Sequence, residues 1–193
     1  MSQLKPEDLY SLEEYAKIRN DFRAKVMTHK QNRKVHLGTN ATLYFEDRLT
    51  MQYQVQEMLR IERIFEQEGI ADELAAYNPL VPDGTNWKAT FMVEYSDVDE
   101  RREALARLIG IEDKIWVQVE GHDRVFAIAD EDLERADETK TSSVHFLRFE
   151  LTPAMISKLK SGLGLSMGID HPNYQVAVTV QEVTRDSLIQ DLD

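Results

Sequence analysis

The stretch from Phe45 to Phe65, FEDRLTMQYQVQEMLRIERIF, decides how this sequence folds. It contains neither Gly nor Pro, and Gly69 stands where a helix stop is expected. On a helical wheel, one broad face is apolar, and it consists of Met51, Val55, Met58, Leu59, Ile61 and Phe65. A second apolar patch, on the opposite side, consists of Leu49, Tyr53 and Ile64. A helix that is apolar on two sides is typically packed between two other elements, so this stretch is predicted to be the central helix.

Glu62 is the exception on that helix, because it falls in the middle of the main apolar face, and Glu66 lies one turn further on. Buried charges are normally paired, so Glu62 is predicted to be buried against a cation such as Arg19 or Arg23. The alternative is that Glu62 and Glu66 are carboxylates of a metal site. The Glu-x-x-His pattern of di-iron bundles is absent, however.

Composition excludes several function classes. The chain has 193 residues, a net charge of −12 and no cysteine, which excludes disulfides, thiolate nucleophiles and cysteine-ligated metal or iron–sulfur centres. No apolar run approaches the ~20 residues of a membrane span, and the first residues lack the apolar core of a signal peptide, so we expect a cytoplasmic protein. The overall negative field argues against nucleic acid as a partner. No resident metal or other cofactor is predicted.

Positive charge gathers in one segment, residues 17–36. It holds seven Lys and Arg residues and one carboxylate, a net charge of +6. Such a segment is either solvated or neutralised internally, or it is a docking face for an acidic partner or a phosphate-bearing ligand. The candidate binding residues are Lys25, His29, Lys30, Arg33 and Lys34. Phe22, Val26 and His29 mark the inward side at helical spacing, and Lys25 and Arg33 are predicted to point away from it.

The rest of the pattern predicts an α+β protein. Residues 1–86 form a mainly helical part with the central helix, and residues 87–193 form a sheet part of the same compact domain. We expect the helical part to wrap a mostly antiparallel sheet of about five to seven strands. Residues 87–135 and 143–185 share the order strand, helix, hairpin, short helix, which indicates an internal duplication. In the second unit, Thr152 followed by Pro153 is a helix start, with Thr152 as the N-cap.

Residues 45–54, 78–80, 88–92 and 142–150 resemble a family of bacterial proteins of unknown function, and the resemblance spans essentially the whole chain. Genes of that family often neighbour genes for rubrerythrin-like di-iron proteins and for iron–sulfur oxidoreductases of the heterodisulfide-reductase type. The resemblance therefore implies an accessory role in such a redox system, by association only. It brings no catalytic residues with it.

Two functions remain open at this point. The first, which the sequence favours, is a non-enzymatic accessory or docking protein that uses the basic segment. The second is a metal-dependent or acid–base enzyme that uses Glu62, Glu66 and His145. His145 shares a strand face with Leu147 and Phe149, so a hydrogen-bonded core histidine is the expected role. Gly162–Gly168 has the wrong spacing and context for a phosphate loop, and it is predicted to be a strand whose small side lets another group approach closely.

Overall fold

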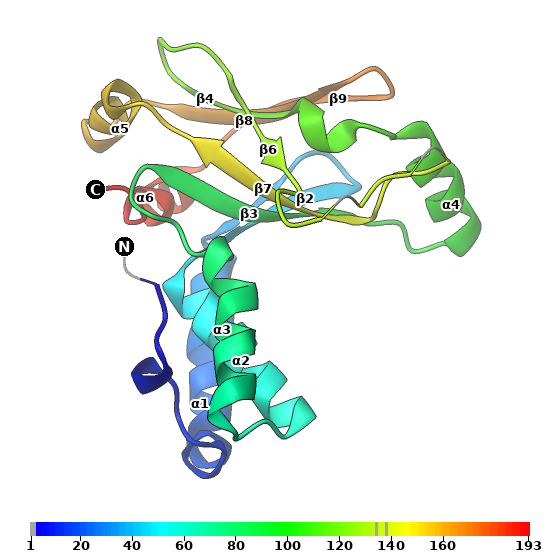
Figure 1. Cartoon of the computed structure of the whole chain (residues 1–193). Coiled ribbons are helices and arrows are strands. Elements are labelled where there is room, and N and C mark those ends of the chain that lie inside the picture. Colours follow the sequence, from blue (N-terminus) through cyan, green and yellow to red (C-terminus); the bar gives the residue numbers. More distant parts are fainter. Residues whose placement is uncertain (1–2, 134, 138) are drawn as a thin grey trace.

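The structure is a computed structural model, and it describes residues 3–133, 135–137 and 139–193. Two layers of antiparallel strands lie one above the other, and an arm of helices projects from the lower layer (Figure 1). The predicted α+β class is therefore confirmed. The prediction of one sheet wrapped by helices is wrong, because there are two sheets and the helical arm meets only the outer face of the first sheet.

The helices are α1 (Leu12–Gln31), α2 (Arg48–Glu62), α3 (Gln67–Tyr77), α4 (Val98–Arg107), α5 (Pro153–Lys160) and α6 (Glu182–Ile189), with 3-10 turns at Pro6–Asp8, Asn78–Leu80 and Ile111–Lys114. The first sheet has the order β1 (Lys34–His36), β2 (Ala41–Glu46), β3 (Asn86–Val93), β7 (Val144–Glu150) and β6 (Ile128–Ala129). The second sheet has the order β5 (Val125–Phe126), β4 (Ile115–Val119), β8 (Leu165–His171) and β9 (Tyr174–Thr179).

The main core lies between the two sheets. On β3 the apolar side chains alternate along the strand, and Trp87, Ala89, Phe91 and Val93 are all buried. On β8, Gly168 allows the close approach that its small side predicts. A Cβ atom added there would lie 2.4 Å from the Trp116 ring of β4, so only glycine fits beneath that ring. Apolar burial on the inner faces of both sheets thus stabilises the layered part of the molecule.

The two predicted units have the same connectivity. Each runs from a strand of the first sheet (β3 or β7) through a helix (α4 or α5) to a strand of the second sheet (β4 or β8) and back through a hairpin. β3 pairs with β7, β4 pairs with β8, and β5 and β9 flank the second pair, an arrangement related by an approximate two-fold axis. The short helix predicted at residues 130–135 is not formed by the residues described there, whereas its counterpart α6 is present.

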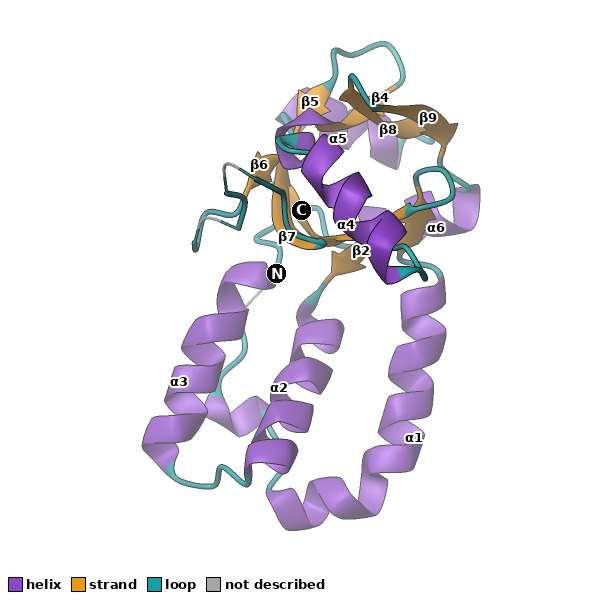
Figure 2. Cartoon of the chain, turned by 90° about the vertical axis from the view of Figure 1, so that its right-hand side faces the viewer, coloured by secondary structure: helices purple, strands orange, loops and turns teal. Residues whose placement is uncertain are grey.

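The helical arm is built around α2, as the sequence predicts. Figure 2 shows α2 between α1 and α3. Leu49 and Tyr53 pack in the cluster on the α1 side, while Val55 and Leu59 pack in the cluster shared with α3. Asp47 caps the start of α2 by accepting a hydrogen bond from the Thr50 amide at 2.9 Å.

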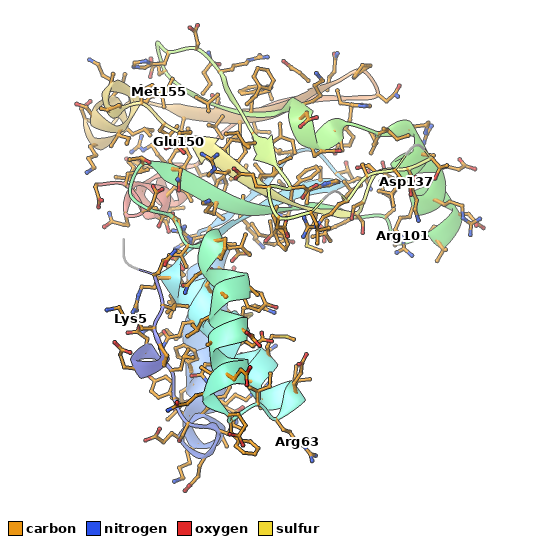
Figure 3. The ribbon with its side chains drawn as sticks, viewed as in Figure 1. Lys5, Arg63, Arg101, Asp137, Glu150 and Met155 are labelled. Atoms are coloured by element: carbon orange, nitrogen blue, oxygen red, sulfur yellow. The ribbon has the colours of Figure 1, made fainter. Side chains whose placement is uncertain are left out.

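The predicted extent of the central helix is wrong at its end. α2 stops at Glu62 because Arg63 adopts a left-handed conformation with φ of 57°, and Figure 3 places Arg63 at the free end of the arm. On both sides of that point the chain has little to pack against, so Ile61 and Phe65 are 62% and 71% exposed. Within the described ranges, no helix is both long and apolar enough to cross a membrane.

Candidate functional site

A cavity of about 510 Å³ lies where the three helices of the arm meet the outer face of the first sheet. We call it the junction cavity, and its lining residues are Met27, Lys30, Gln31, Lys34, Tyr44, Glu46, Met51, Gln54, Tyr77, Leu80, Thr90, Met92, Val144 and Phe146. A smaller cavity of about 310 Å³ adjoins it and shares Tyr77, Leu80 and Phe146. Its far side carries charged groups of the sheet, including Lys88 and Arg148.

Strand alternation provides the floor of the junction cavity. On β2, Leu43 and Phe45 point into the core between the sheets, so Tyr44 and Glu46 face the helices. The register places Tyr44 opposite Thr90 of β3, and Thr90 opposite Phe146 of β7. Adjacent strands therefore bring a phenol, a carboxyl group, a hydroxyl and an aromatic ring onto one surface.

Glu46 is the polar group that distinguishes this cavity. Its side chain is buried, with a relative exposure of 5% for the residue. One carboxylate oxygen, Oε1, accepts a hydrogen bond from the Thr90 hydroxyl at 2.9 Å. The other, Oε2, is shielded from solvent and has no hydrogen-bond partner among the described residues. A buried acceptor without a donor is energetically costly, so a donor from outside the chain would be bound favourably here.

Two of the predicted binding residues reach the junction cavity. Lys30 of α1 is partly buried and Lys34 of β1 is exposed, and neither side chain has an ion pair or hydrogen bond within the described part of the chain. Lys25 is exposed as well, but it is not part of the cavity lining. At 3.6 residues per turn, Lys25 and Lys30 lie about 140° apart around α1. The basic segment therefore does not form a single face.

The other two predicted binding residues belong to a closed polar cluster. Arg33 is 2% exposed, which contradicts the prediction that it points outward. Its guanidinium forms ion pairs with Asp47 and Asp191 and donates to the carbonyl oxygens of Phe45 and Ser187. The reason is that α1 ends before Arg33, so helical spacing no longer sets the direction of this side chain.

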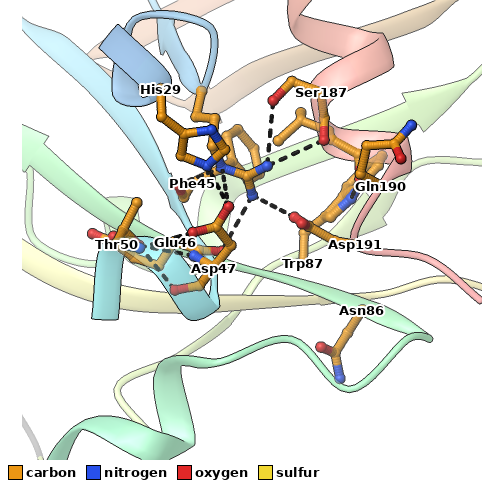
Figure 4. Close-up of polar contacts among 12 residues, drawn as sticks. His29, Phe45, Glu46, Asp47, Thr50, Asn86, Trp87, Ser187, Gln190 and Asp191 are labelled. Atoms are coloured by element: carbon orange, nitrogen blue, oxygen red, sulfur yellow. Dashed lines mark hydrogen bonds and ion pairs between the residues drawn. The ribbon is translucent and has the colours of Figure 1, made fainter. Parts of the chain in front are cut away.

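His29 and both carboxylates complete the Arg33 cluster, which joins α1, α2 and α6 (Figure 4). His29 Nε2 lies 2.5 Å from Asp47 Oδ2. Burial works against ionisation of Asp47, but Arg33, the Thr50 amide and His29 together lower its pKa. Burial raises the pKa of Asp191 to about 6, and the nearby Asp47 charge adds to that effect. The cluster is a structural element, since it fastens the C-terminal helix to the base of the arm.

His145 is a hydrogen-bonded core histidine, as its strand face predicts. It is fully buried, with Nδ1 at 2.5 Å from Asp130 and Nε2 at 2.8 Å from the Thr141 hydroxyl. The Ser142 carbonyl oxygen lies 3.1 Å from Nε2, so both ring nitrogens face acceptors. Thr141 also donates to Glu112. His145 lines neither the junction cavity nor its smaller neighbour.

The predicted burial of Glu62 is wrong. Glu62 and Glu66 are both exposed, near the free end of the arm, whereas His145 lies within the first sheet. These three candidate catalytic residues therefore do not form one site. The carboxylate that pairs with the N-terminal helix is Glu57, which accepts two hydrogen bonds from Arg19, each of 2.8 Å. Among the described residues, no group of His, Asp and Glu side chains is arranged to hold a metal ion.

Comparison with known proteins places the chain in a family. Residues 3–192 match the model of the family described as "Protein of unknown function (DUF3501)". The chain belongs to this family. A crystal structure at 1.90 Å resolution of a novel protein of unknown function from Burkholderia pseudomallei K96243 is 51% identical, covers 100% of both chains and has a TM-score of 0.95. No curated protein matches the sequence.

Membership in DUF3501 agrees with the resemblance to a bacterial family of unknown function. The family description names no activity, substrate or partner. The redox association of neighbouring genes stays a prediction. Glu46 and Glu57 were not predicted as site residues because their neighbours carry no motif. The alternation along residues 41–46 is the signal that could have placed Glu46 on the face opposite the core.

Proposed function

We propose that this DUF3501 protein is a non-enzymatic accessory protein that docks onto an acidic redox protein through exposed cations of α1. The observation that supports the proposal is the state of Arg23 and Lys25. Both are exposed, and neither has an ion pair or hydrogen bond among the residues that the structure describes. In a chain with a net charge of −12, cations left without a carboxylate partner suit an acidic protein. Arg23 and Lys25 lie about 160° apart around α1, so such a partner would contact both flanks of the helix.

The exposed cations of α1 would act on the association with a partner rather than on the stability of the chain. Exposed charges add little to the stability of the chain itself, because water screens them. They do orient an approaching partner and raise the association rate, an effect that weakens as salt increases, since charges are screened within ~10 Å at 0.1 M ionic strength. The gene neighbourhood of the resembling family supports a di-iron or iron–sulfur oxidoreductase as the partner.

The enzymatic alternative has less support from the geometry. It requires Glu62, Glu66 and His145 to act together, and the fold separates the two glutamates from the histidine. His145 is enclosed by Asp130 and Thr141 and lines neither cavity at the base of the arm.

The docking proposal is tested with a double charge reversal, Arg23→Glu with Lys25→Glu. The matched control reverses two exposed lysines of α5, Lys158→Glu with Lys160→Glu, which changes the net charge by the same amount on a different surface. Wild-type protein and both variants are used to capture partners from the native host, and the captured oxidoreductase is then purified and titrated. We expect the α1 variant to associate at least about tenfold more slowly, and the α5 variant to match the wild type.

Two results contradict the proposal. One is capture of the same acidic protein by the α1 variant at the wild-type rate. The other is an equal loss with the α5 control, which would mean that net charge alone is responsible. Thermal unfolding of all three proteins checks that the substitutions leave the fold unchanged.

A further inference from the structure

We propose that the junction cavity binds a small molecule that has an apolar body and two charged ends. One end is an amino group that reaches Glu46, and the other is an anionic group, such as a carboxylate, that reaches Lys30 and Lys34. This site is independent of the docking surface, since neither Arg23 nor Lys25 lines the cavity.

The shape and lining of the cavity suit such a molecule. A volume of about 510 Å³ falls within the range of sites for small organic ligands. Much of the wall is apolar and comes from every side of the junction, with Met27 from α1, Met51 from α2, Met92 from β3 and Phe146 from β7. Methionine side chains are flexible and polarisable, so this wall adapts to an aliphatic or aromatic body.

Glu46 supplies the recognition of the amino group. Thr90 occupies one carboxylate oxygen, and Oε2 has no donor among the described residues although the side chain is buried. Because Oε2 is shielded from solvent, the Glu46 side chain must turn toward the cavity for a ligand to reach it. A protonated amine would then give Oε2 a charge-assisted hydrogen bond, which is about twice as strong as a neutral one. The amine would also neutralise a carboxylate that is otherwise buried without a cation beside it. The gain in binding free energy is therefore larger for an amine than for an alcohol.

The lysines explain why the ligand also carries an anion. Lys34 lies opposite Tyr44 in the β1–β2 ladder, and Glu46 follows two residues later on the same face. That diagonal relation separates the Lys34 and Glu46 backbone positions by roughly 7–8 Å. No ion pair between Glu46 and either lysine forms within the described part of the chain. The Glu46 carboxylate and the two lysines are therefore available separately, to bind the two ends of one ligand.

The test uses four probes that share an eight-carbon chain and differ only in their ends: 8-aminooctanoate, octylamine, octanoate and octanol. Binding to the full chain is measured by calorimetry and by NMR of the probe. We expect 8-aminooctanoate to bind at least about tenfold more tightly than any of the other three, because only it satisfies both groups.

Two sets of variants assign the ends of the ligand. Glu46→Gln should weaken 8-aminooctanoate and octylamine about tenfold and leave octanoate within about twofold. Lys30→Gln with Lys34→Gln should do the reverse. Met92→Trp, which fills the cavity, should weaken all four probes. Lys158→Gln with Lys160→Gln on α5 is the matched control and should change nothing.

The proposal is overturned if none of the probes binds the wild type, or if Glu46→Gln binds octylamine and 8-aminooctanoate as the wild type does. Equal weakening of all four probes by Glu46→Gln would also overturn it, because that result means a collapsed cavity rather than a lost amine contact. Capture of the redox partner by Glu46→Gln remains as in the wild type under the docking proposal, so the two proposals fail separately.

Discussion

Glu46 and Asp47 are neighbours in the sequence, yet they sit in opposite kinds of polar environment. Asp47 faces the Arg33 cluster, where the Thr50 amide, His29 and Arg33 satisfy its carboxylate. Glu46 faces the junction cavity, where one of its oxygens has no donor among the described residues. The two residues lie on opposite sides of the chain where β2 ends and α2 begins.

This difference distinguishes a polar cluster that holds the fold together from a cavity that can bind a ligand. In the Arg33 cluster, every guanidinium nitrogen has a partner from the chain itself, so the cluster fastens three parts of the molecule together. Asp191 Oδ1 is buried without a hydrogen-bond partner among the described residues, but Asp191 lines neither cavity at the base of the arm. In the junction cavity, donors and acceptors remain without partners among the residues that the structure describes. Polar groups satisfied within a fold stabilise it, whereas unsatisfied buried groups indicate a missing partner.

The largest effect is expected from Arg33→Met. The substitution leaves Asp47 and Asp191 as two buried carboxylates without their shared cation, and breaking such a pair costs about 3–5 kcal/mol of unfolding free energy. Urea unfolding measures the loss. Arg23→Met, on the exposed side of α1, is the control and should match the wild type. An Arg33→Met protein as stable as the control would show that the cluster does not hold the arm in place.

The next effect is a dependence of stability on pH that comes from Asp191. Its pKa rises from 3.8 to about 6 on folding, so between these values the folded state keeps a proton that the unfolded state has released. Stability from this group is therefore complete below pH 4 and falls by about 2–3 kcal/mol as the pH rises to 6. Asp191→Asn should remove that slope. Unfolding at pH 4.5, 5.5 and 6.5 checks it, and an unchanged slope in the variant would assign the titration to another group.

The smallest effects come from comparing Glu57→Gln with Glu46→Gln. Arg19, Arg60 and the Tyr15 hydroxyl hold Glu57, and Arg19 contributes most to lowering the pKa of Glu57 to about 2. Glu57→Gln should therefore cost about 1–2 kcal/mol. Glu46→Gln keeps the Thr90 contact and removes an unpartnered charge, so stability should fall by no more than about 0.5 kcal/mol. A larger loss at Glu46 than at Glu57 would reverse the contrast between the two sites.

The sequence predicts correctly those features that local patterns dominate. The alternation that begins at Trp87 became β3, and Thr152 caps α5 by accepting a hydrogen bond from the Met155 amide at 3.3 Å. The shared order of the two units also appears in the sheet connectivity. Patterns of this kind depend on period and on single capping residues, both of which are visible in the sequence.

The predictions of side-chain burial are wrong where the neighbours of a side chain come from distant elements. Glu62 lies on the apolar face of the helical wheel but is exposed, because α2 ends there and neither α1 nor α3 covers it. Arg33 looked like an exposed cation, but Asp191, 158 residues later, buries it. Helical spacing gives the direction of a side chain and does not tell what lies in that direction.

The sequence by itself determined the α+β class, the central helix with two apolar sides, and the absence of cysteine chemistry. The tertiary structure decided which charged groups form ion pairs with one another and which remain available to a ligand or a partner. That choice depends on where β1, β2 and α6 come together, since contacts between residues far apart in the chain determine the burial of each charged group. Such contacts pair Arg33 with Asp47 and Asp191, whereas Glu46 lines a cavity.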